Sequence, residues 1–390
     1  SVLPVVLDVG TNNKELLEDP LYLGMPHPRI DGQEYYDFVD EWVTAVRSRW
    51  PGVLIQFEDF KNPHAYQLLA KYRNKIRCFN DDIQSTSSIT LAGILASLKS
   101  RGKTQDDLVH EKIVCVGAGS AGVGVCEGIV DAMQESGQIK SREEGYSKIY
   151  MLDQYGLLGS PDIKEDRKTT RKRDYELDDQ QRHYAKQDVA DESGLEDVIR
   201  HVKPSVILGL SGAHGVFTEK AIREMARHQE KPVIFPLSNP DSHAECTAEE
   251  AFRWTDGRAI FASGTAFDQV KLENGKIGKT NLCNNAYSFP GIGLGVTVSK
   301  ASRVTNRMFL ETARTIAEMA TPEQLKQGQL FPPVDKLREI ALHVGTRVCE
   351  IAYEDGVATN PLGEGEILSD LVQRSAYEPE YTPLVYQPKH

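Results

Sequence analysis

Apolar residues in the middle of the chain come in short unbroken runs, and each run is followed by a segment with helical spacing. The runs are rich in β-branched residues, as in strands buried on both faces. They lie at residues 113–116, 148–152, 206–208, 233–235 and 260–262, with the clearest helical spacing at 195–201 and 219–227. This alternation predicts an α/β fold, a Rossmann-type doubly wound parallel sheet covered by helices on both faces.

The two ends of the chain show other patterns. Residues 302–320 and 334–353 have helical spacing, which predicts a helical C-terminal region. Residues 356–390 mix Pro, Gly, Tyr and acids, a composition typical of an extended tail. Residues 1–10 read SVLPVVLDVG, which predicts a buried strand.

Composition and charge indicate which kind of molecule the protein binds. The 390 residues include 45 Lys and Arg against 57 Asp and Glu, a formal net charge of −12. That charge disfavours a nucleic-acid surface and favours a small-molecule partner, while the length favours at least two domains. No apolar run approaches the ~20 residues of a membrane span, and no signal-peptide pattern is visible. We therefore expect a cytoplasmic protein that binds neither membrane nor nucleic acid.

The six cysteines are spread along the chain without a CxxC pair, at Cys78, Cys115, Cys126, Cys246, Cys283 and Cys349. Two of them fall in a predicted strand and a predicted helix. This usage favours reduced thiols that fill the core, although an even number leaves disulfides open.

The clearest local motif is IVCVGAGSAG at 113–122, where Gly-x-Gly-x-x-Gly follows a predicted strand and opens a predicted helix. The glycines allow a tight turn and a close approach of the backbone to a pyrophosphate at the helix N-terminus. The next strand ends at Asp153, which can accept hydrogen bonds from ribose hydroxyls. These flanks favour dinucleotide binding over a turn with steric glycines. The residues expected at the cofactor in this motif are Gly117, Gly119, Ser120, Ala121 and Gly122.

The acid at residue 153 also bears on the choice of cofactor. A carboxylate there would repel a 2′-phosphate, which favours NAD over NADP. A basic cluster nearby can reach such a phosphate, but clusters of this kind are more often solvated loops. Its members are Arg167, Lys168, Arg171, Lys172 and Arg173. NAD is therefore the predicted cofactor.

Four carboxylates stand at the ends of two apolar runs, in IQFEDF at 55–60 and FNDDIQ at 79–84. Like charges repel, and desolvating them is costly, so a cation is expected beside them. Glu58, Asp59 and Asp82 offer an oxygen-rich set suited to Mg²⁺ or Mn²⁺. Helix capping by Asp59 and Asp82 is the alternative, but it explains one acid at each place and not two.

A set of longer motifs covers nearly the whole chain. They read LDVGTNN at 7–13, QFEDF at 56–60, FNDDIQ at 79–84, LSNP at 237–240, AECT at 244–247, FASG at 261–264, NNAY at 284–287 and FPG at 289–291. In this order they resemble the malic enzyme and malolactic enzyme family.

The resemblance implies an activity and a set of residues. It implies oxidation of L-malate with NAD and a divalent cation, then loss of CO₂ to give pyruvate, or lactate in malolactic members. The implied roles are metal ligation by Glu58, Asp59 and Asp82, catalysis by Asp81, malate binding by Asn239 and Asn285, and a cofactor contact by Asn239. Without the resemblance, either amide reads equally well as a turn residue.

Some features depart from the family pattern. The resemblance implies a catalytic Tyr, a Lys base and a carboxylate-binding Arg ahead of LDVGTNN, and residues 1–6 contain none of them. Loss of a general base costs ~10²–10⁴-fold, so we expect low activity. Ser85 replaces a Gly of the family, and 281–283 read NLC in place of Gly-Gln-Gly, which predicts altered placement of the substrate.

Three functions therefore stay open. The first is NAD- and metal-dependent oxidation and decarboxylation of malate to pyruvate. The second is malolactic conversion of L-malate to L-lactate and CO₂. The third is a non-catalytic NAD-binding fragment that lacks the general base.

The same analysis predicts the domain organisation. Residues 81–284 are expected to form the NAD-binding domain, inserted into a substrate and metal domain built from 1–80 and 285–355. Residues 356–390 would be the extended tail. The active site is expected in the cleft between the two domains. The resemblance also implies an oligomer, and we expect a homodimer.

Overall fold

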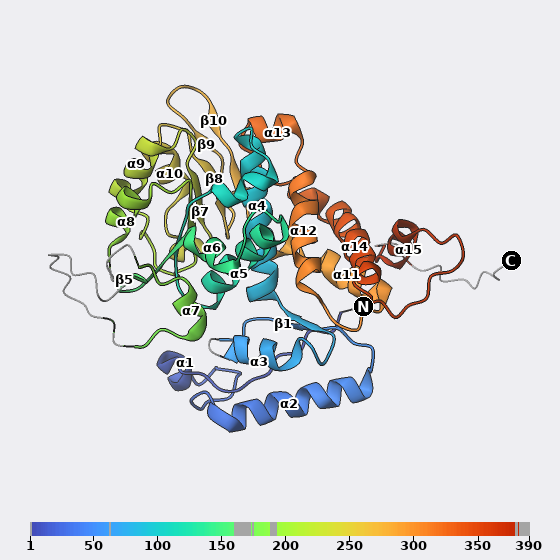
Figure 1. Ribbon diagram of the computed structural model, residues 1–390. Helices are drawn as coiled ribbons and strands as arrows, with labels where there is room; N and C mark the ends of the chain where they lie inside the picture. The colour runs from blue at the N-terminus through green and yellow to red at the C-terminus, as the bar shows by residue number, and fades with distance from the viewer. Residues whose placement is uncertain are drawn as a thin grey trace. The chain divides into compact units, whose positions relative to one another are not determined.

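The computed structural model describes residues 2–61, 64–159, 173, 175–187, 193–378 and 381. The chain divides into two compact units, Ser1–Val53 and Leu54–His390. In the first unit, α1 covers Lys14–Glu18 and α2 covers Gly32–Arg49 (Figure 1).

The predicted strand at the start of the chain is wrong. Residues 2–10 form no strand, and Val2 and Val6 are 94% and 90% exposed. The Asp8 carboxylate accepts hydrogen bonds from the N–H groups of Gly10 and Met25, at 3.0 and 2.8 Å. Such side-chain bonds to the backbone favour a turn over a strand ladder.

The helices and the short strands of the second unit surround a larger sheet. The α-helices are α3 (His64–Tyr72), α4 (Thr86–Ser100), α5 (Ser120–Glu135), α6 (Arg142–Ser147), α7 (Asp179–His183), α8 (Leu195–Val202), α9 (Glu219–His228), α10 (Ala248–Trp254), α11 (Phe289–Ser299), α12 (Asn306–Glu318), α13 (Pro322–Lys326), α14 (Leu337–Glu354) and α15 (Leu368–Ser375). Short helical turns are η1 (Asp81–Ser85), η2 (Gln105–His110), η3 (Asp241–His243), η4 (Asn285–Tyr287) and η5 (Val334–Lys336). The short pairs are β1 (Ile55–Phe57) with β2 (Cys78–Asn80), and β9 (Val270–Lys271) with β10 (Ile277–Gly278).

The central sheet of the described residues has seven strands in the order β11-β8-β7-β6-β3-β4-β5. These are β3 (Ile113–Val116), β4 (Ile149–Asp153), β5 (Gly156–Leu157), β6 (Val206–Gly209), β7 (Val233–Pro236), β8 (Ile260–Ser263) and β11 (Thr280–Leu282). All neighbours pair in parallel except β4 and β5. The chain passes from β3 to β4 on one side and later to β6 on the other, so the strand order reverses beside β3, as in a doubly wound fold. The predicted strands and fold class are confirmed.

Both faces of this sheet are buried. In β3, Ile113 and Cys115 join one apolar cluster, with residues of α4 and α5, while Val114 and Val116 join another, with residues of α8, α9 and α10. Figure 1 shows α8, α9 and α10 together on one side of the sheet. Because side chains alternate along a strand, an unbroken apolar run supplies both clusters.

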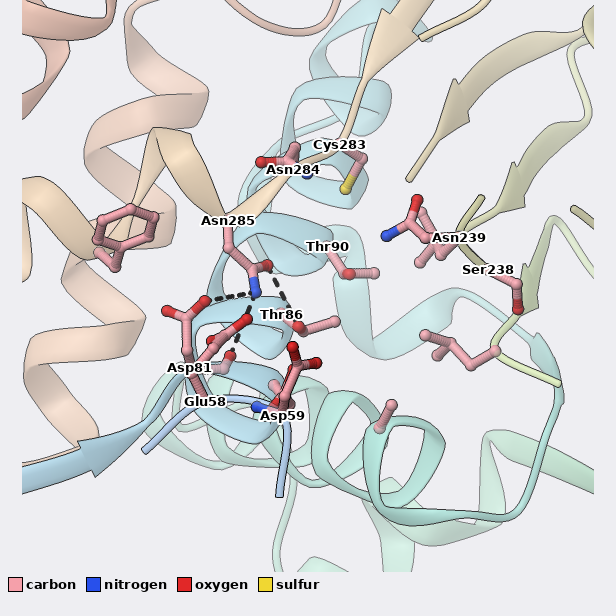
Figure 2. A pocket seen from close by; sticks show the side chains of 15 residues that line it. Glu58, Asp59, Asp81, Thr86, Thr90, Ser238, Asn239, Cys283, Asn284 and Asn285 are labelled. Atoms are coloured by element: carbon pink, nitrogen blue, oxygen red, sulfur yellow. Dashed lines mark hydrogen bonds between the residues drawn. The ribbon is translucent and has the colours of Figure 1, made fainter. Parts of the chain in front are cut away.

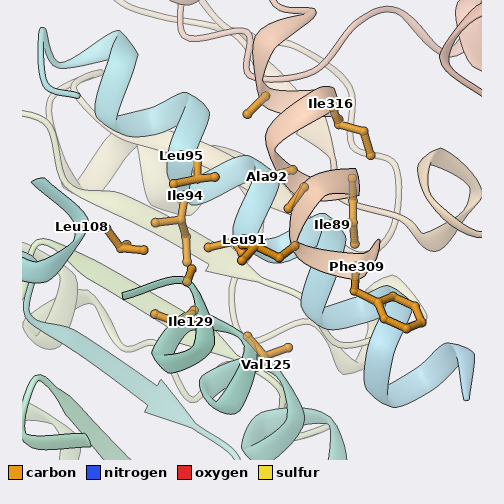
Figure 3. Close-up of a cluster of buried hydrophobic side chains, with 14 of the residues drawn as sticks. Ile89, Leu91, Ala92, Ile94, Leu95, Leu108, Val125, Ile129, Phe309 and Ile316 are labelled. Atoms are coloured by element: carbon orange, nitrogen blue, oxygen red, sulfur yellow. The ribbon is translucent and has the colours of Figure 1, made fainter. Parts of the chain in front are cut away.

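Helix α4 runs through the larger cluster, and every residue from Ser87 to Leu98 is buried. It packs against α5 and α12, and Figure 3 shows its Ile89, Leu91 and Ile94 among the side chains of those helices. A helix without a polar face is stable only when it is surrounded. Its N-terminal turn is thereby held at a fixed position beside the site described below.

The C-terminal region is helical as predicted, but the tail is not extended throughout. Within the predicted tail, Leu368–Ser375 forms α15, and Val372 is buried with Val298 and Cys349. Leu368, Leu371 and Val372 have helical spacing, so an apolar stripe is present in a segment whose composition alone favoured an extended chain.

All six cysteines are buried and free, which confirms the prediction of core thiols. Among the described helices, none combines the length and the apolar character needed to cross a bilayer.

Glu111 lies just before β3 and bonds both to two cations near the end of α4 and to Ser205, just before β6. Its side chain is fully buried and accepts hydrogen bonds from Arg101 Nη1 at 2.9 Å and Lys103 Nζ at 2.6 Å, and from the Ser205 hydroxyl. Burial by itself would raise the pKa of Glu111, but the Arg101 charge and the three donors outweigh it and lower the pKa below 4.5.

We expect this group to contribute to acid sensitivity. Its stabilisation is complete above the unfolded-state pKa and is lost as the pH falls through the lower folded-state value. Glu111→Gln should cost about 3 kcal/mol at neutral pH, because two cations lose their partner, and should flatten the fall of stability in acid. Urea unfolding of both proteins between neutral pH and pH values below 4.5 tests this. Parallel curves would contradict it.

Candidate active site

A two-stranded parallel pair brings the four carboxylates together. Strands β1 and β2 are in register, with Phe57 opposite Asn80. Residues that follow the two strands must therefore leave from the same edge. Glu58 and Asp59 come directly after β1, and the Asp81–Asp82 pair comes directly after β2.

The predicted metal ligands form a compact cluster. Carboxylate oxygens of Glu58, Asp59 and Asp82 all lie within 4.8 Å of one another, and the Asp59 N–H donates to Asp82 Oδ2 at 2.8 Å. Asp82 lies within the π-helical turn η1, a turn type frequent at functional sites. That turn is capped by Asn80, whose side chain accepts from the Ile83 N–H at 2.9 Å. Capping therefore does not account for Asp82.

Burial and like charges both raise carboxylate pKa values in this cluster. Desolvation, followed by the charges of Asp82 and Asp81, raises the pKa of Glu58 to about 8. Desolvation also raises the pKa of Asp82, with the charges of Asp59 and Asp81 adding to it. A divalent cation would convert this repulsion into attraction.

Asp81 is the most buried of the four acids, 3% exposed. It orients Asn285, a residue predicted to bind the substrate. Asn285 Nδ2 donates to Asp81 Oδ2 at 2.9 Å, and Thr86 Oγ1 donates to Asn285 Oδ1 at 3.2 Å (Figure 2). The other oxygen, Asp81 Oδ1, is buried and accepts no hydrogen bond from the described residues. An orphaned buried carboxylate oxygen beside an acidic cluster fits a site that completes itself with a cation or a substrate.

A cavity of about 400 Å³ opens beside this cluster and collects most of the predicted site. Predicted residues on its wall are Glu58, Asp59, Asp81, Asp82, Ala121, Asn239 and Asn285. Other residues on the wall were not predicted for the site, and these are Thr86, Thr90, Leu210, Leu237, Ser238, Asn284 and Phe289. Cys283 also lines the cavity, and it belongs to the NLC segment that replaces the Gly-Gln-Gly of the family. Asn239 and Ser238 lie across the cavity from Asn285 (Figure 2). Several of the missed residues belong to motifs already recognised, such as LSNP and NNAY.

The glycine-rich loop lies at the N-terminus of α5 and is tightly packed. Gly119 is the N-cap of α5, and Gly117 has a φ of 122°, which favours glycine. A Cβ on Gly122 would lie 1.8 Å from the Gly117 carbonyl oxygen. Tyr66 donates from its hydroxyl to the Ser120 carbonyl at 2.7 Å. Of the loop residues predicted to contact the cofactor, only Ala121 is among the cavity residues named above.

Asp153 lies at the end of β4, but its oxygens already have donors. Oδ2 accepts from Arg173 Nε at 2.6 Å and from the Tyr175 hydroxyl at 2.7 Å. Oδ1 accepts from the N–H groups of Tyr155 and Gly156, at 2.7 and 3.0 Å. Burial would raise the pKa of Asp153, and the bonds from Arg173 and Tyr175 outweigh it and lower the pKa. The ribose contact stays a prediction. The other basic residues of the cluster, Arg167, Lys168, Arg171 and Lys172, lie outside the described residues.

Asp59 carries a strained backbone, with a φ of 59°. Asparagine tolerates this left-handed conformation better than alanine, which should lose about 1 kcal/mol there. Asp59→Asn and Asp59→Ala both remove a repelled charge, so we expect the asparagine variant to be the more stable by about 1 kcal/mol. Urea unfolding in the presence of a chelator measures the difference. Equal stabilities would show that the backbone at Asp59 is not strained.

Family models match two parts of this chain. "Malic enzyme, N-terminal domain" matches residues 1–73, and "Malic enzyme, NAD binding domain" matches residues 83–353.

Curated relatives match nearly the full chain. The hydrogenosomal malic enzyme of Neocallimastix frontalis is 48% identical over 99% of this chain and 62% of its own length. An NADP-dependent malic enzyme of Dictyostelium discoideum is 42% identical over 97% of this chain and 66% of its own length. An NAD-dependent malic enzyme of Photorhabdus laumondii is 43% identical over 97% and 65%. The chain thus spans slightly less than two thirds of the length of these relatives.

Solved structures show the same similarity. The malic enzyme of Entamoeba histolytica aligns over 89% of this chain and 65% of its own, with a TM-score of 0.67 and 26% identity. The malic enzyme of Pyrococcus horikoshii aligns over 90% and 71%, with a TM-score of 0.66, and its 23% identity supports the fold alone.

Proposed function

Because this chain belongs to the malic enzyme family, we propose that it oxidises L-malate with NAD and a divalent cation and decarboxylates the product to pyruvate. The observation that carries the proposal is the shared cavity. It joins the carboxylates of Glu58, Asp59 and Asp82 to the amides of Asn239 and Asn285, at the N-terminal end of α5. This grouping of acids and amides supports metal-assisted hydride transfer as the chemistry of the site.

Glu58, Asp59 and Asp82 would hold the cation as Mg²⁺ or Mn²⁺, since three carboxylates with room for water or substrate suit either ion. When bound, the cation would polarise the malate hydroxyl oxygen and stabilise the negative charge that develops as CO₂ leaves.

The substrate would lie between two amides and one acid. Asn285 is pre-oriented by Asp81 and Thr86, so its amide is held without a ligand. Asn239, across the cavity, would bind the malate from the other side. Asp81 is on the cavity wall and its buried Oδ1 accepts no hydrogen bond from the described residues, so we assign Asp81 the role of taking the hydroxyl proton.

The dinucleotide would bind at the loop of Gly117, Gly119 and Gly122, with its pyrophosphate at Ser120 and Ala121. When bound, its nicotinamide would accept the hydride from malate. We propose NAD as the cofactor, supported by the description of the matching domain model and by relatives named NAD-dependent. One relative is named NADP-dependent, so both dinucleotides belong in the first assay.

Incubation with L-malate, NAD and Mn²⁺, with and without a chelator, tests the proposal. NADH is followed optically, and pyruvate, oxaloacetate and lactate are quantified. We expect NADH and pyruvate to appear in equal amounts when Mn²⁺ is present without the chelator. Neither should appear when the chelator is added. Lactate without net NADH would establish the malolactic reaction instead. NAD binding without turnover at any metal concentration would establish a cofactor-binding chain that is not a catalyst on its own.

Further features of the whole protein are part of this proposal. We propose an NAD-binding domain over 81–284, inserted in a substrate and metal domain of 1–80 and 285–355. We also propose a cytoplasmic homodimer. One relative is named hydrogenosomal, which makes the compartment worth testing directly.

A further inference from the structure

Glu245 is a fully buried carboxylate directly behind one wall of the cavity. Its Oε1 accepts from the Ser238 hydroxyl at 2.6 Å, and Ser238 itself lines the cavity beside Asn239. The same Oε1 accepts from the Ser211 hydroxyl and the Ser211 N–H, at 2.7 and 2.9 Å. Ser211 lies in the loop after β6, and Ser238 lies in the loop after β7. One carboxylate therefore joins the two loops.

The two loops are also joined to each other and to the glycine-rich loop. The Gly212 N–H donates to Ser238 Oγ at 2.8 Å, so the Ser238 hydroxyl accepts from one loop while it donates to the acid. Gly117 packs so closely on the β6 loop that a Cβ there would lie 2.3 Å from the Leu210 carbonyl oxygen. A shift of Ser211 or Ser238 would therefore displace both loops and the glycine-rich loop that packs on them. We call the space that these three loops border the cofactor crevice.

The charge of Glu245 is unusual because no cation balances it. Glu111, equally buried, has Arg101 and Lys103, whereas no ion pair to Glu245 is found in the part of the chain that the structure describes. Its bonds in the described structure are all accepted from serine hydroxyls and backbone N–H groups. An uncompensated buried charge acts strongly on whatever charge comes near it.

The strand order indicates which half of a bound dinucleotide would lie near Glu245. In a doubly wound fold the pyrophosphate lies at the glycine-rich loop, and the adenosine ribose lies at the end of the next strand, here β4. Strands β6 and β7 lie on the other side of β3, so the nicotinamide half would extend over their loops. The oxidised nicotinamide ring is positively charged, and the reduced ring is neutral.

We propose that Glu245 is a positioning residue of the cofactor site, which fixes the β6 and β7 loops and makes this wall of the crevice favour the oxidised dinucleotide. This inference rests on the proposed function, because it requires that the chain bind NAD.

The test is the affinity of purified variants for NAD⁺ by calorimetry and for NADH by fluorescence. Glu245→Gln keeps the shape of the side chain and removes its charge. We expect NAD⁺ to bind about tenfold more weakly and NADH to change by less than about threefold. Glu111→Gln is the matched control, a buried carboxylate at the opposite ends of the strands. It should lose stability but leave both dissociation constants unchanged.

A second variant separates the effect of the hydrogen bonds between the two loops from the effect of the Glu245 charge. Ser238→Ala retains the carboxylate but breaks the bridge between the loops, so both dinucleotides should bind about threefold more weakly. If Glu245→Gln does not fold, unchanged affinities in Ser238→Ala overturn the proposal. Unchanged or equally weakened affinities in a folded Glu245→Gln also overturn it. If the unmodified chain binds neither dinucleotide, the proposed function fails, and this inference fails with it.

Discussion

Mn²⁺ at a large excess over its dissociation constant is expected to raise the unfolding temperature of this chain, and Asp82→Ala is expected to abolish the rise. A ligand that binds only the folded state at 100 times its dissociation constant adds about 2.7 kcal/mol. Here the gain is supported by a cluster whose oxygens lie within 4.8 Å and whose charges otherwise repel one another. Thermal unfolding with Mn²⁺ and with a chelator measures the effect.

The matched control is Asp370→Ala, which removes an exposed carboxylate on α15, outside the cavity. Its response to Mn²⁺ should equal that of the unmodified chain. A full Mn²⁺ response in Asp82→Ala would remove Asp82 from the ligand set. No response in the unmodified chain would contradict the metal site itself.

Gly122→Ala is expected to abolish measurable NAD binding and to destabilise the fold by about 2–4 kcal/mol. The new Cβ would lie 1.8 Å from the Gly117 carbonyl oxygen, a contact that only a backbone shift can relieve. The shift would move the loop that is expected to bind the pyrophosphate. It would also move the backbone N–H groups at the N-terminal end of α5. Calorimetry with NAD and urea unfolding report the two effects separately.

Gly293→Ala provides the control for that change. Gly293 lies in α11, and the nearest side-chain atom to its added Cβ is 3.9 Å away, on Leu54. Alanine in an open helical position adds up to about 1 kcal/mol of stability. NAD affinity should stay as it is. An unchanged NAD affinity in Gly122→Ala would show that the loop does not hold the cofactor.

The fold could be predicted where apolar spacing was unambiguous. Five strands, and helices such as α8 and α9, follow from runs and spacing such as those at 113–116 and 195–201, because strands buried on both faces need unbroken apolar sequence. The spacing misled at residues 1–10, where Asp8 binds the backbone and a turn results. In α15, composition predicts an extended tail, whereas three apolar residues at helical spacing form the stripe of a helix.

The candidate site was predicted residue by residue, but its assembly was not. The motifs pointed to Glu58, Asp82 and Asn285, and the structure brings all three to one cavity. Asp153 was expected to be open to a ribose, yet Arg173 and Tyr175 already bond to it. Those partners are about twenty residues away in sequence, and local spacing says nothing about such contacts.

By itself, the sequence determined the alternation of strands and helices, the glycine-rich turn and the family, because each of these is written in local spacing or in motif order. Only the tertiary structure decided that β1 and β2 pair in register, which brings acids from two separate motifs within 4.8 Å. It also decided that Glu245 joins the loops after β6 and β7, a role that no motif assigned to it. The physical reason is the same in both cases. Electrostatic and hydrogen-bonding partners are chosen by distance in space, and that distance is set by how buried strands and helices pack.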